Sequence, residues 1–294
     1  MRIDPPRLQV ISAALLFSTG GAAIKTGAFT AAQVSCLRSA IAAIALVVWL
    51  GRRVSWSPML IAVAVPYAAT LILFVASTKL TTAANAIFLQ STAPFYVLLL
   101  GPFVLGERFA WRNVAYLALI GVGLVFCVIG QPASTATAPD PFTGTVLGVV
   151  CSVTWAFTLL TLRSAQRGRS EDDVGLSAVV AGNSIAALVA FPFAWPLPPA
   201  PLVEWATLAY LGVFQVGLAY VFLTAAMRRL PAVDVSLLLL IEPVFNPIWT
   251  WLVRGEQPGT WVIVGGVLIV AATAIATKHT NNGNLPQRAQ RSPR

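Results

Sequence analysis

Charged residues are scarce in this chain. Asp, Glu, Lys and Arg make up 10% of its 294 residues, whereas a typical soluble domain carries roughly 25%. Hydrophobic residues make up 57%, and the mean hydropathy is +0.80. A chain of this composition cannot cover its surface with charge. Its surface must therefore face lipid, which excludes a soluble globular fold.

Histidine and cysteine are also rare. The single histidine, His279, follows the last apolar run, so no histidine base or histidine metal ligand lies within the apolar part. Cys36, Cys127 and Cys151 each lie inside an apolar run and form neither a metal-binding nor a disulfide pattern. The sequence also lacks the GxxxxGK[ST] motif of ATP-driven pumps. We expect no enzyme activity, no cofactor and no metal site.

Long apolar runs fill most of the chain. Each is about 20 residues long, which is the length of a bilayer-spanning helix. Each is bounded by charge, Pro or Gly. We expect an all-α integral membrane protein, because helices satisfy their own backbone groups in lipid. The ten expected transmembrane helices are 8–25, 31–50, 58–78, 82–105, 111–130, 143–163, 174–195, 203–226, 232–253 and 259–277.

Two of these runs match each other at a fixed offset of 149 positions. An internal repeat of this kind is typical of transporters built from two related halves. Because each half would hold five helices, it would end on the opposite side from its start, so the two halves are expected to be inverted. The matched pairs are Ala83/Ala232, Asn85/Asp234, Pro94/Pro243, Gly106/Gly255 and Glu107/Glu256.

The repeat divides the chain into segments. We expect a first five-helix repeat over 8–130, a linker over 131–142, a second repeat over 143–277 and a disordered cytoplasmic tail over 278–294. We expect the first apolar run to belong to the fold rather than to a cleaved signal, because Phe17 and Lys25 match Trp155 and Arg163 at an offset of 138.

Positive charges are distributed unequally between the loops. With the N-terminus inside, fifteen Lys and Arg residues fall in cytoplasmic segments and three, Lys25, Lys79 and Arg254, fall outside. This asymmetry predicts that both termini are cytoplasmic. The arginines are spread over several short loops, so the net charge of +9 does not indicate a nucleic-acid partner. The expected location is the inner membrane of a bacterium, crossed many times.

The repeated stretches share a further pattern. A helix that begins with small residues contains a proline, ends at Gly-Glu and is followed by an aromatic residue that opens the next helix. This pattern resembles the drug/metabolite transporter superfamily of the EamA type. By its general likeness along the chain, the sequence is most similar to the YddG-type amino-acid exporters. The resemblance covers about 8–277 and implies ten helices in two inverted halves. The two copies run Ala83…Pro94…Gly106-Glu107…Trp111 and Ala232…Pro243…Gly255-Glu256…Trp261.

Glu242 is the strongest candidate for function. An ionisable group in the hydrocarbon region costs about 2.5–3.5 kcal/mol on insertion scales and is a functional candidate by default. Glu242 lies near the middle of its expected helix, and its counterpart in the first half is Ala93. It could exchange a proton and so couple transport, hold a substrate ammonium, or serve as a neutral or paired structural residue.

Arg38 is the second candidate. It lies about seven residues into the second expected helix. It could bind a substrate carboxylate, pair with Glu242, or extend its long side chain toward the membrane surface. Relatives of the EamA type commonly carry an arginine at this place, so the resemblance implies that Arg38 matters.

Aromatic and amide side chains form helical stripes that could line a cavity or simply pack. Asn85, Leu89, Thr92 and Tyr96 form one such stripe, with spacings of i, i+4, i+7 and i+11. Gln215 and Phe222 share a face of the eighth expected helix, with Tyr220 nearby. Asn85 could instead cap its helix. Gly20, Pro94 and Pro243 are expected to act as hinges. The expected substrate-binding residues are Phe17, Arg38, Asn85, Leu89, Thr92, Tyr96, Trp155, Gln215, Phe222, Glu242 and Asn246.

These observations predict a secondary transporter. It would export small metabolites, most of all neutral or aromatic amino acids, by alternating access through a cavity at the membrane midplane. Its partners would be a small-molecule substrate, protons if Glu242 couples transport, and the lipid bilayer. Two alternatives stay open: a multidrug or other metabolite carrier of the same superfamily, and a membrane structural or sensory subunit without transport.

Overall fold

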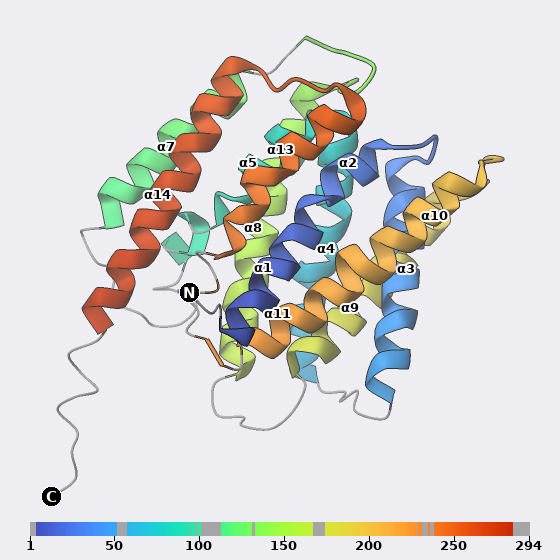
Figure 1. The fold of residues 1–294 in the computed structure, drawn as a ribbon, viewed down its shortest axis with the longest axis horizontal. Helices are drawn as coiled ribbons and strands as arrows, with labels where there is room; N and C mark the ends of the chain where they lie inside the picture. Colours follow the sequence, from blue (N-terminus) through green and yellow to red (C-terminus); the bar gives the residue numbers. More distant parts are fainter. Residues whose placement is uncertain are drawn as a thin grey trace, which may run out of the picture.

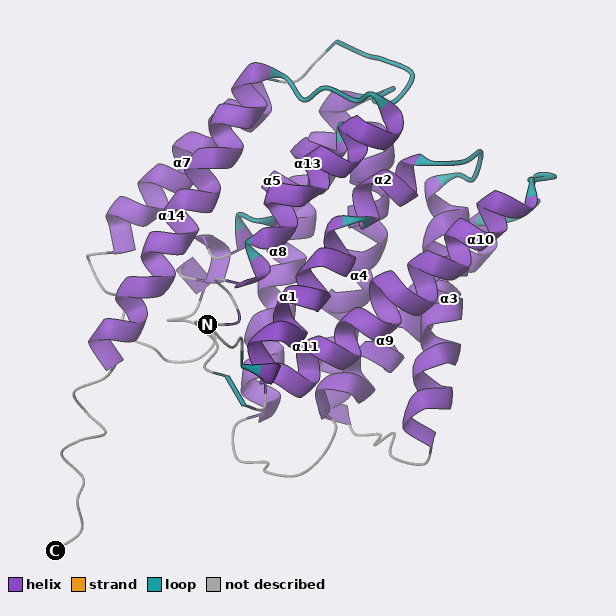
Figure 2. Ribbon diagram, in the orientation of Figure 1, coloured by secondary structure: helices purple, strands orange, loops and turns teal. Residues whose placement is uncertain are grey.

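The computed structural model describes the helical body of the chain. The described residues are 4–51, 58–93, 95–97, 99–100, 113–130, 133–166, 174–227, 229–230, 235 and 238–284. In this part of the chain the regular structure is helical, apart from one isolated bridge between Thr135 and Ala138 (Figure 2). The all-α prediction is confirmed there.

The described helices follow the expected apolar runs. Six continuous spans are long and apolar enough to cross a membrane, and two shorter apolar helices accompany them. The bounds are α1 Pro5–Ser18, α2 Gly20–Lys25, α3 Ala31–Leu50, α4 Pro58–Leu80, α5 Ala83–Gln90, α7 Asn113–Ile129, α8 Pro141–Gln166, α9 Val174–Ala190, the 3-10 turn η2 Phe191–Phe193, α10 Leu202–Tyr210, the π-helix η3 Leu211–Leu218, α11 Ala219–Met227, α13 Ile241–Arg254 and α14 Thr260–Asn284.

Local sequence explains where several helices begin and end. Thr30 accepts a hydrogen bond from the Gln33 backbone while the Gln33 side chain accepts one from the Thr30 backbone, which starts α3 with a capping box. Asp140 precedes α8 and accepts hydrogen bonds from Thr143, which hold the pKa of the Asp140 carboxyl below its usual range. Gly255 ends α13 with φ of 65°, a left-handed conformation that glycine adopts without strain.

Helices from the two expected halves pack against each other. α4 lies against α8 and α9, α3 against α9, and α1 against α11 and α13. α7 and α14 lie side by side along one flank of the bundle (Figure 1). The three main clusters of buried residues in the described part of the chain therefore contain residues of both halves.

Parts of the two repeated stretches lie outside the described residues. In the first stretch these parts include Gly106, Glu107 and Trp111, and in the second they include Ala232 and Asp234. α14 continues to Asn284, so residues 278–284 of the expected tail are helical, and residues 285–294 lie outside the described residues.

Candidate functional site

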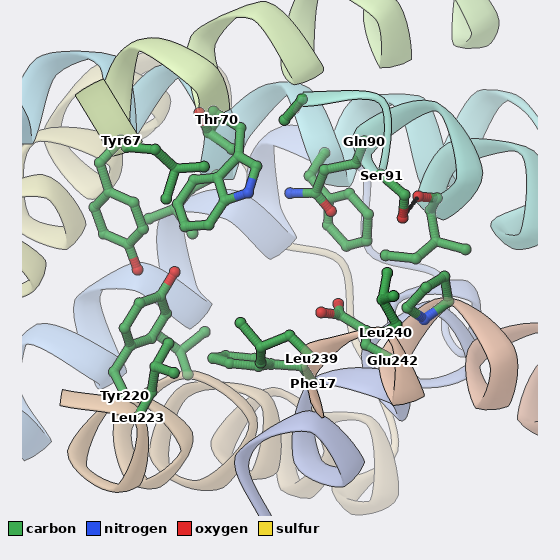
Figure 3. A pocket seen from close by; sticks show the side chains of 18 of the residues that line it. Phe17, Tyr67, Thr70, Gln90, Ser91, Tyr220, Leu223, Leu239, Leu240 and Glu242 are labelled. Carbon is green, nitrogen blue, oxygen red and sulfur yellow. Dashed lines mark hydrogen bonds between the residues drawn. The ribbon is translucent and has the colours of Figure 1, made fainter. Parts of the chain in front are cut away.

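A cavity of about 330 Å³ lies among the helices of both halves. Six of the residues predicted for binding or hinge motion line it: Phe17, Arg38, Trp155, Gln215, Glu242 and Pro243. Figure 3 shows Tyr67 and Tyr220 at one end of this cavity and Glu242, Gln90 and Ser91 toward the other. The cavity thus carries one basic and one acidic side chain within mainly apolar walls.

Arg38 reaches the cavity from α3, and its residue is only 1% exposed. One nitrogen, Nη2, donates a hydrogen bond of 3.3 Å to the Leu71 carbonyl of α4. Its Nε atom is buried without a hydrogen-bond partner in the described part of the chain. A buried guanidinium with unused donors is costly unless a ligand or water completes its hydrogen bonds.

Glu242 lies in the first turn of α13, immediately before Pro243. Leu240, which precedes this helix, offers no side-chain cap to the free N–H groups. A carboxylate in the first turn interacts favourably with these groups and with the positive end of the helix dipole. The helix start favours a negative charge at Glu242, whereas the mainly apolar wall of the cavity disfavours one.

The fourth and ninth expected helices are interrupted at equivalent positions. α5 ends at Gln90 and is followed by a turn at Ser91, whereas α13 begins after a turn at Leu240. Ser91 and Leu240 are 149 positions apart, so both breaks fall at the same place in the repeat. The expectation of two continuous helices, 82–105 and 232–253, is therefore wrong at these turns.

Proline provides the physical reason for the breaks. A proline lacks the N–H that would bond the carbonyl four residues earlier. Pro94 therefore cannot bond Gln90, and Pro243 cannot bond Leu239. Both Gln90 and Leu239 line the cavity. Pro94 itself lies outside the described residues, so its hinge role stays a prediction, as does that of Pro243.

Gly20 also lies at a helix interruption. The first expected helix, 8–25, is divided into α1 and α2 by a turn at Thr19. A Cβ on Gly20 would come within 2.7 Å of Gln215 Nε2, so the absent side chain leaves room for Gln215 at the cavity wall. The hinge role of Gly20 stays a prediction.

Gln215 belongs to an unexpected π-helical segment. The eighth expected helix, 203–226, consists of α10, the π-helix η3 and α11. π-helical turns widen the helix and occur frequently at functional sites. This segment supplies Gln215 and Val216 to the cavity, and α11 adds Tyr220 and Leu223.

Several predicted binding residues lie elsewhere. Three of them face α8. Asn85 donates a hydrogen bond of 2.7 Å to Thr145 Oγ1, and Thr92 donates one of 3.1 Å to Ser152 Oγ. Leu89 packs beside Gly148. The capping interpretation of Asn85 is wrong, because Thr82 caps α5 and accepts a hydrogen bond from the Asn85 backbone.

The remaining three are also absent from the cavity lining. Tyr96 packs edge-on against Phe95. Phe222 packs into an apolar cluster of α1 and α11. Asn246 is fully buried beside Gly21, whose absent Cβ would otherwise lie 2.3 Å from Asn246 Oδ1. A binding role for these residues stays a prediction.

Five polar lining residues were not predicted: Tyr67, Thr70, Gln90, Ser91 and Thr273. A usable signal existed for Gln90 and Ser91, because these polar residues lie inside an apolar run four and three positions before Pro94. Tyr67 similarly follows Pro66, the proline inside α4. Tyr220 had been noted only as a neighbour of Gln215 and Phe222.

Comparison with known proteins finds relatives that are named as exporters. The pseudopaline exporter CntI of Pseudomonas aeruginosa (strain UCBPP-PA14) is 32% identical over 94% of this chain and 96% of its own length. The aromatic amino acid exporter YddG of Ancylobacter novellus is 26% identical over 68% of each chain. A solved crystal structure shares the fold, with a TM-score of 0.63 and 23% identity over 95% of this chain and 98% of that one.

The EamA-like transporter family matches residues 7–129 and 142–278, which is most of the chain. Its relatives are named as transporters or exporters. The chain therefore belongs to the EamA-like transporter family and is a multi-pass membrane protein.

Proposed function

We propose that this protein exports small zwitterionic metabolites, with neutral or aromatic amino acids first, across the bacterial inner membrane. The observation that carries this proposal is the single cavity, in the described part of the chain, that presents Arg38 and Glu242 between helices of both halves. One charge of each sign suits a substrate that carries a carboxylate and an ammonium. The aromatic rings of Phe17, Phe74 and Trp155 suit an apolar side chain.

The proposed architecture is ten transmembrane helices in two inverted repeats, over 8–130 and 143–277. The packing of α7 and α14, the fifth helix of each repeat, supports inversion. Gly130 at the end of α7 lies beside Trp261 at the start of α14, and Gly123 lies beside Ile269. Equivalent helices thus run antiparallel, as inverted halves require.

The proposed mechanism is alternating access. Interrupted helices at corresponding repeat positions are typical of secondary transporters, in which they surround the substrate site. α5 and α13 meet this description, since their breaks lie beside the cavity. Rocking of one half against the other would expose the cavity to each side in turn. Glu242 would hold the substrate ammonium or exchange a proton.

A second substrate is favoured by one comparison. The pseudopaline exporter CntI matches nearly the whole chain at 32% identity, whereas the amino-acid exporters match about two thirds of it at 26%. Pseudopaline is therefore the runner-up substrate. Drugs and other metabolites of the superfamily remain further candidates.

The test is transport by the purified protein in proteoliposomes. Labelled amino acids and pseudopaline are offered one by one, with and without a pH gradient, and empty liposomes serve as the control. We expect saturable flux of at least one neutral or aromatic amino acid. Flux of pseudopaline alone would replace the first substrate by the second, and no flux of any compound would contradict the transport proposal.

A further inference from the structure

Two tyrosines close one end of the cavity. Tyr67 of α4 and Tyr220 of α11 pack edge to face with ring centroids 5.5 Å apart. Both line the cavity, and their hydroxyl groups point toward each other (Figure 3). They come from different expected halves, so this end of the cavity depends on both.

Asn183 of α9 fixes the hydrogen bonding of this pair. Its Nδ2 atom donates a hydrogen bond of 2.8 Å to the Val179 carbonyl, and this bond sets the orientation of the amide. The same Nδ2 atom donates a hydrogen bond of 3.5 Å to the Tyr67 hydroxyl oxygen. Asn183 therefore supplies Tyr67 with a donor and not with an acceptor. The two tyrosine hydroxyls carry two hydrogens, and a bond between them can use only one. At least one hydrogen therefore has no acceptor in the described part of the chain.

Arg38 adds positive charge at the same end. Its Nη2 atom donates a hydrogen bond of 3.3 Å to the carbonyl of Leu71, which lies one turn after Tyr67 on α4, and Leu71 and Tyr67 both line the cavity. Its buried Nε has no partner among the described residues. Gln215 also lines the cavity, and Gly20 leaves space for its amide nitrogen. Unused donors of Arg38 and of the tyrosine pair thus lie in one cavity, in which Gln215 adds a buried oxygen, Oε1, without a partner among the described residues. Glu242 lies toward the end opposite the tyrosines (Figure 3).

We infer that Tyr67 and Tyr220 form, together with Arg38, a subsite that binds the carboxylate of the substrate. A carboxylate accepts hydrogen bonds only, and a guanidinium with a neighbouring hydroxyl offers the charge and the extra donor that it needs. The substrate class is therefore α-amino acids and their derivatives with a free carboxylate, oriented with the ammonium toward Glu242. This inference rests on the proposed transport function and adds two specificity-determining residues to it.

The first test uses the unmodified protein in proteoliposomes. Phenylalanine and phenethylamine differ only in the carboxylate. We expect phenethylamine to inhibit phenylalanine flux at least about tenfold more weakly than unlabelled phenylalanine does, because it leaves Arg38 and the tyrosine hydroxyls without an acceptor. Equal inhibition by the two compounds would overturn the carboxylate subsite.

The second test uses the variants Tyr67→Phe, Tyr220→Phe and their combination. Since either hydroxyl can supply the free hydrogen, the double variant should show the full effect: KM for phenylalanine rises about tenfold or more, kcat changes little, and inhibition by phenethylamine is unchanged. Tyr210→Phe is the matched control, because its hydroxyl lies 2.9 Å from Thr19 Oγ1 and not in this cavity.

The outcomes separate the inference from the proposed function. Unchanged KM in a correctly folded double variant, judged by gel filtration and thermal melting, would overturn the subsite while transport stands. If the double variant does not fold, the phenethylamine comparison on the unmodified protein decides. A wild-type protein that transports no amino acid would overturn the proposed function and this inference with it.

Discussion

Lys25 Nζ lies 2.9 Å from Glu256 Oε2, and both side chains are only 3% exposed. Lys25 also donates to the carbonyls of Thr81, at 2.6 Å, and Thr137. The second carboxylate oxygen of Glu256, Oε1, accepts a hydrogen bond of 2.6 Å from the backbone N–H of Ala83, at the start of α5. This buried pair joins α2, α5, the segment after α13 and the segment before α8.

Glu256→Gln should strongly destabilise the protein. The amide keeps the shape and can still accept from Ala83, but it leaves Lys25 as a buried charge without a counterion. Loss of one partner of a buried pair costs about 3–5 kcal/mol. Thermal melting in detergent measures the effect. Glu204→Gln is the control, since Glu204 accepts from Ala28 at an exposed site and its loss should cost less than about 1 kcal/mol.

A double variant tests whether the charge is the cause. Lys25→Met combined with Glu256→Gln removes both charges and should recover part of the lost stability. If the double variant melts as low as the sum of the single changes predicts, the ion pair contributes no coupling and this interpretation fails.

Two glycines on α7 give a matched pair for packing against α14. A Cβ on Gly123 would lie 2.8 Å from the backbone oxygen of Gly265, whereas a Cβ on Gly121 would meet nothing within 4 Å. Gly123→Ala should cost about 1–3 kcal/mol, because backbone cannot move aside cheaply. Gly121→Ala should be neutral or stabilising by up to about 1 kcal/mol. Equal melting temperatures for the two variants would contradict the close approach of these helices.

Arg38→Ala should abolish or severely weaken transport. A hydrogen bond to a charged group contributes about 1.5–3 kcal/mol, so KM should rise roughly 10- to 150-fold if folding is intact. Arg38→Lys keeps the charge without the planar fork and should show an intermediate defect. Arg229→Ala, at an exposed position, is the control. Normal flux through folded Arg38→Ala protein would exclude a binding role for Arg38.

The sequence predicted the positions of the helices better than their interiors. Apolar run length and the repeat located the described helices, because both follow from the bilayer and from internal symmetry. The breaks at Ser91 and Leu240 were not predicted, since the length and composition of an apolar run are the same whether or not the helix is continuous. Pro243 and Pro94 indicated where irregularity belongs, but not that it would occur three residues earlier.

The binding stripes show why periodicity alone could not identify the cavity. Asn85, Leu89 and Thr92 do share one face of the chain, as their spacing predicted, yet this face packs on α8. Spacing gives a common face but not the neighbour it meets. Gln215 and Phe222 were paired on α-helical spacing, and the π-helix between them shifts that register. Gln215 consequently lines the cavity while Phe222 packs in the core.

Topology offers a test of the inverted repeats. The segments expected outside lie together at one end of the bundle: Lys25 contacts Thr137 and Glu256, and Glu204 contacts Ala28. The segment after α7 and the start of α14 share this end (Figure 1). Cysteines introduced at the exposed positions Ser134 and Gln257 should react with an impermeant maleimide in intact cells. A cysteine at position 107 should react only after the membrane is permeabilised, and labelling of 107 and 257 from the same side would contradict inversion.

Glu242→Gln should separate proton coupling from substrate transport. The amide has nearly the same size but cannot exchange a proton. If Glu242 carries the coupled proton, the variant should lose the response of flux to an imposed pH gradient and keep exchange of substrate across the membrane. The measurement is uptake into proteoliposomes with and without the gradient, beside counterflow without it. A wild-type flux that ignores the gradient and survives the substitution would exclude coupling through Glu242. Loss of both activities in folded protein would instead assign Glu242 to holding the substrate ammonium.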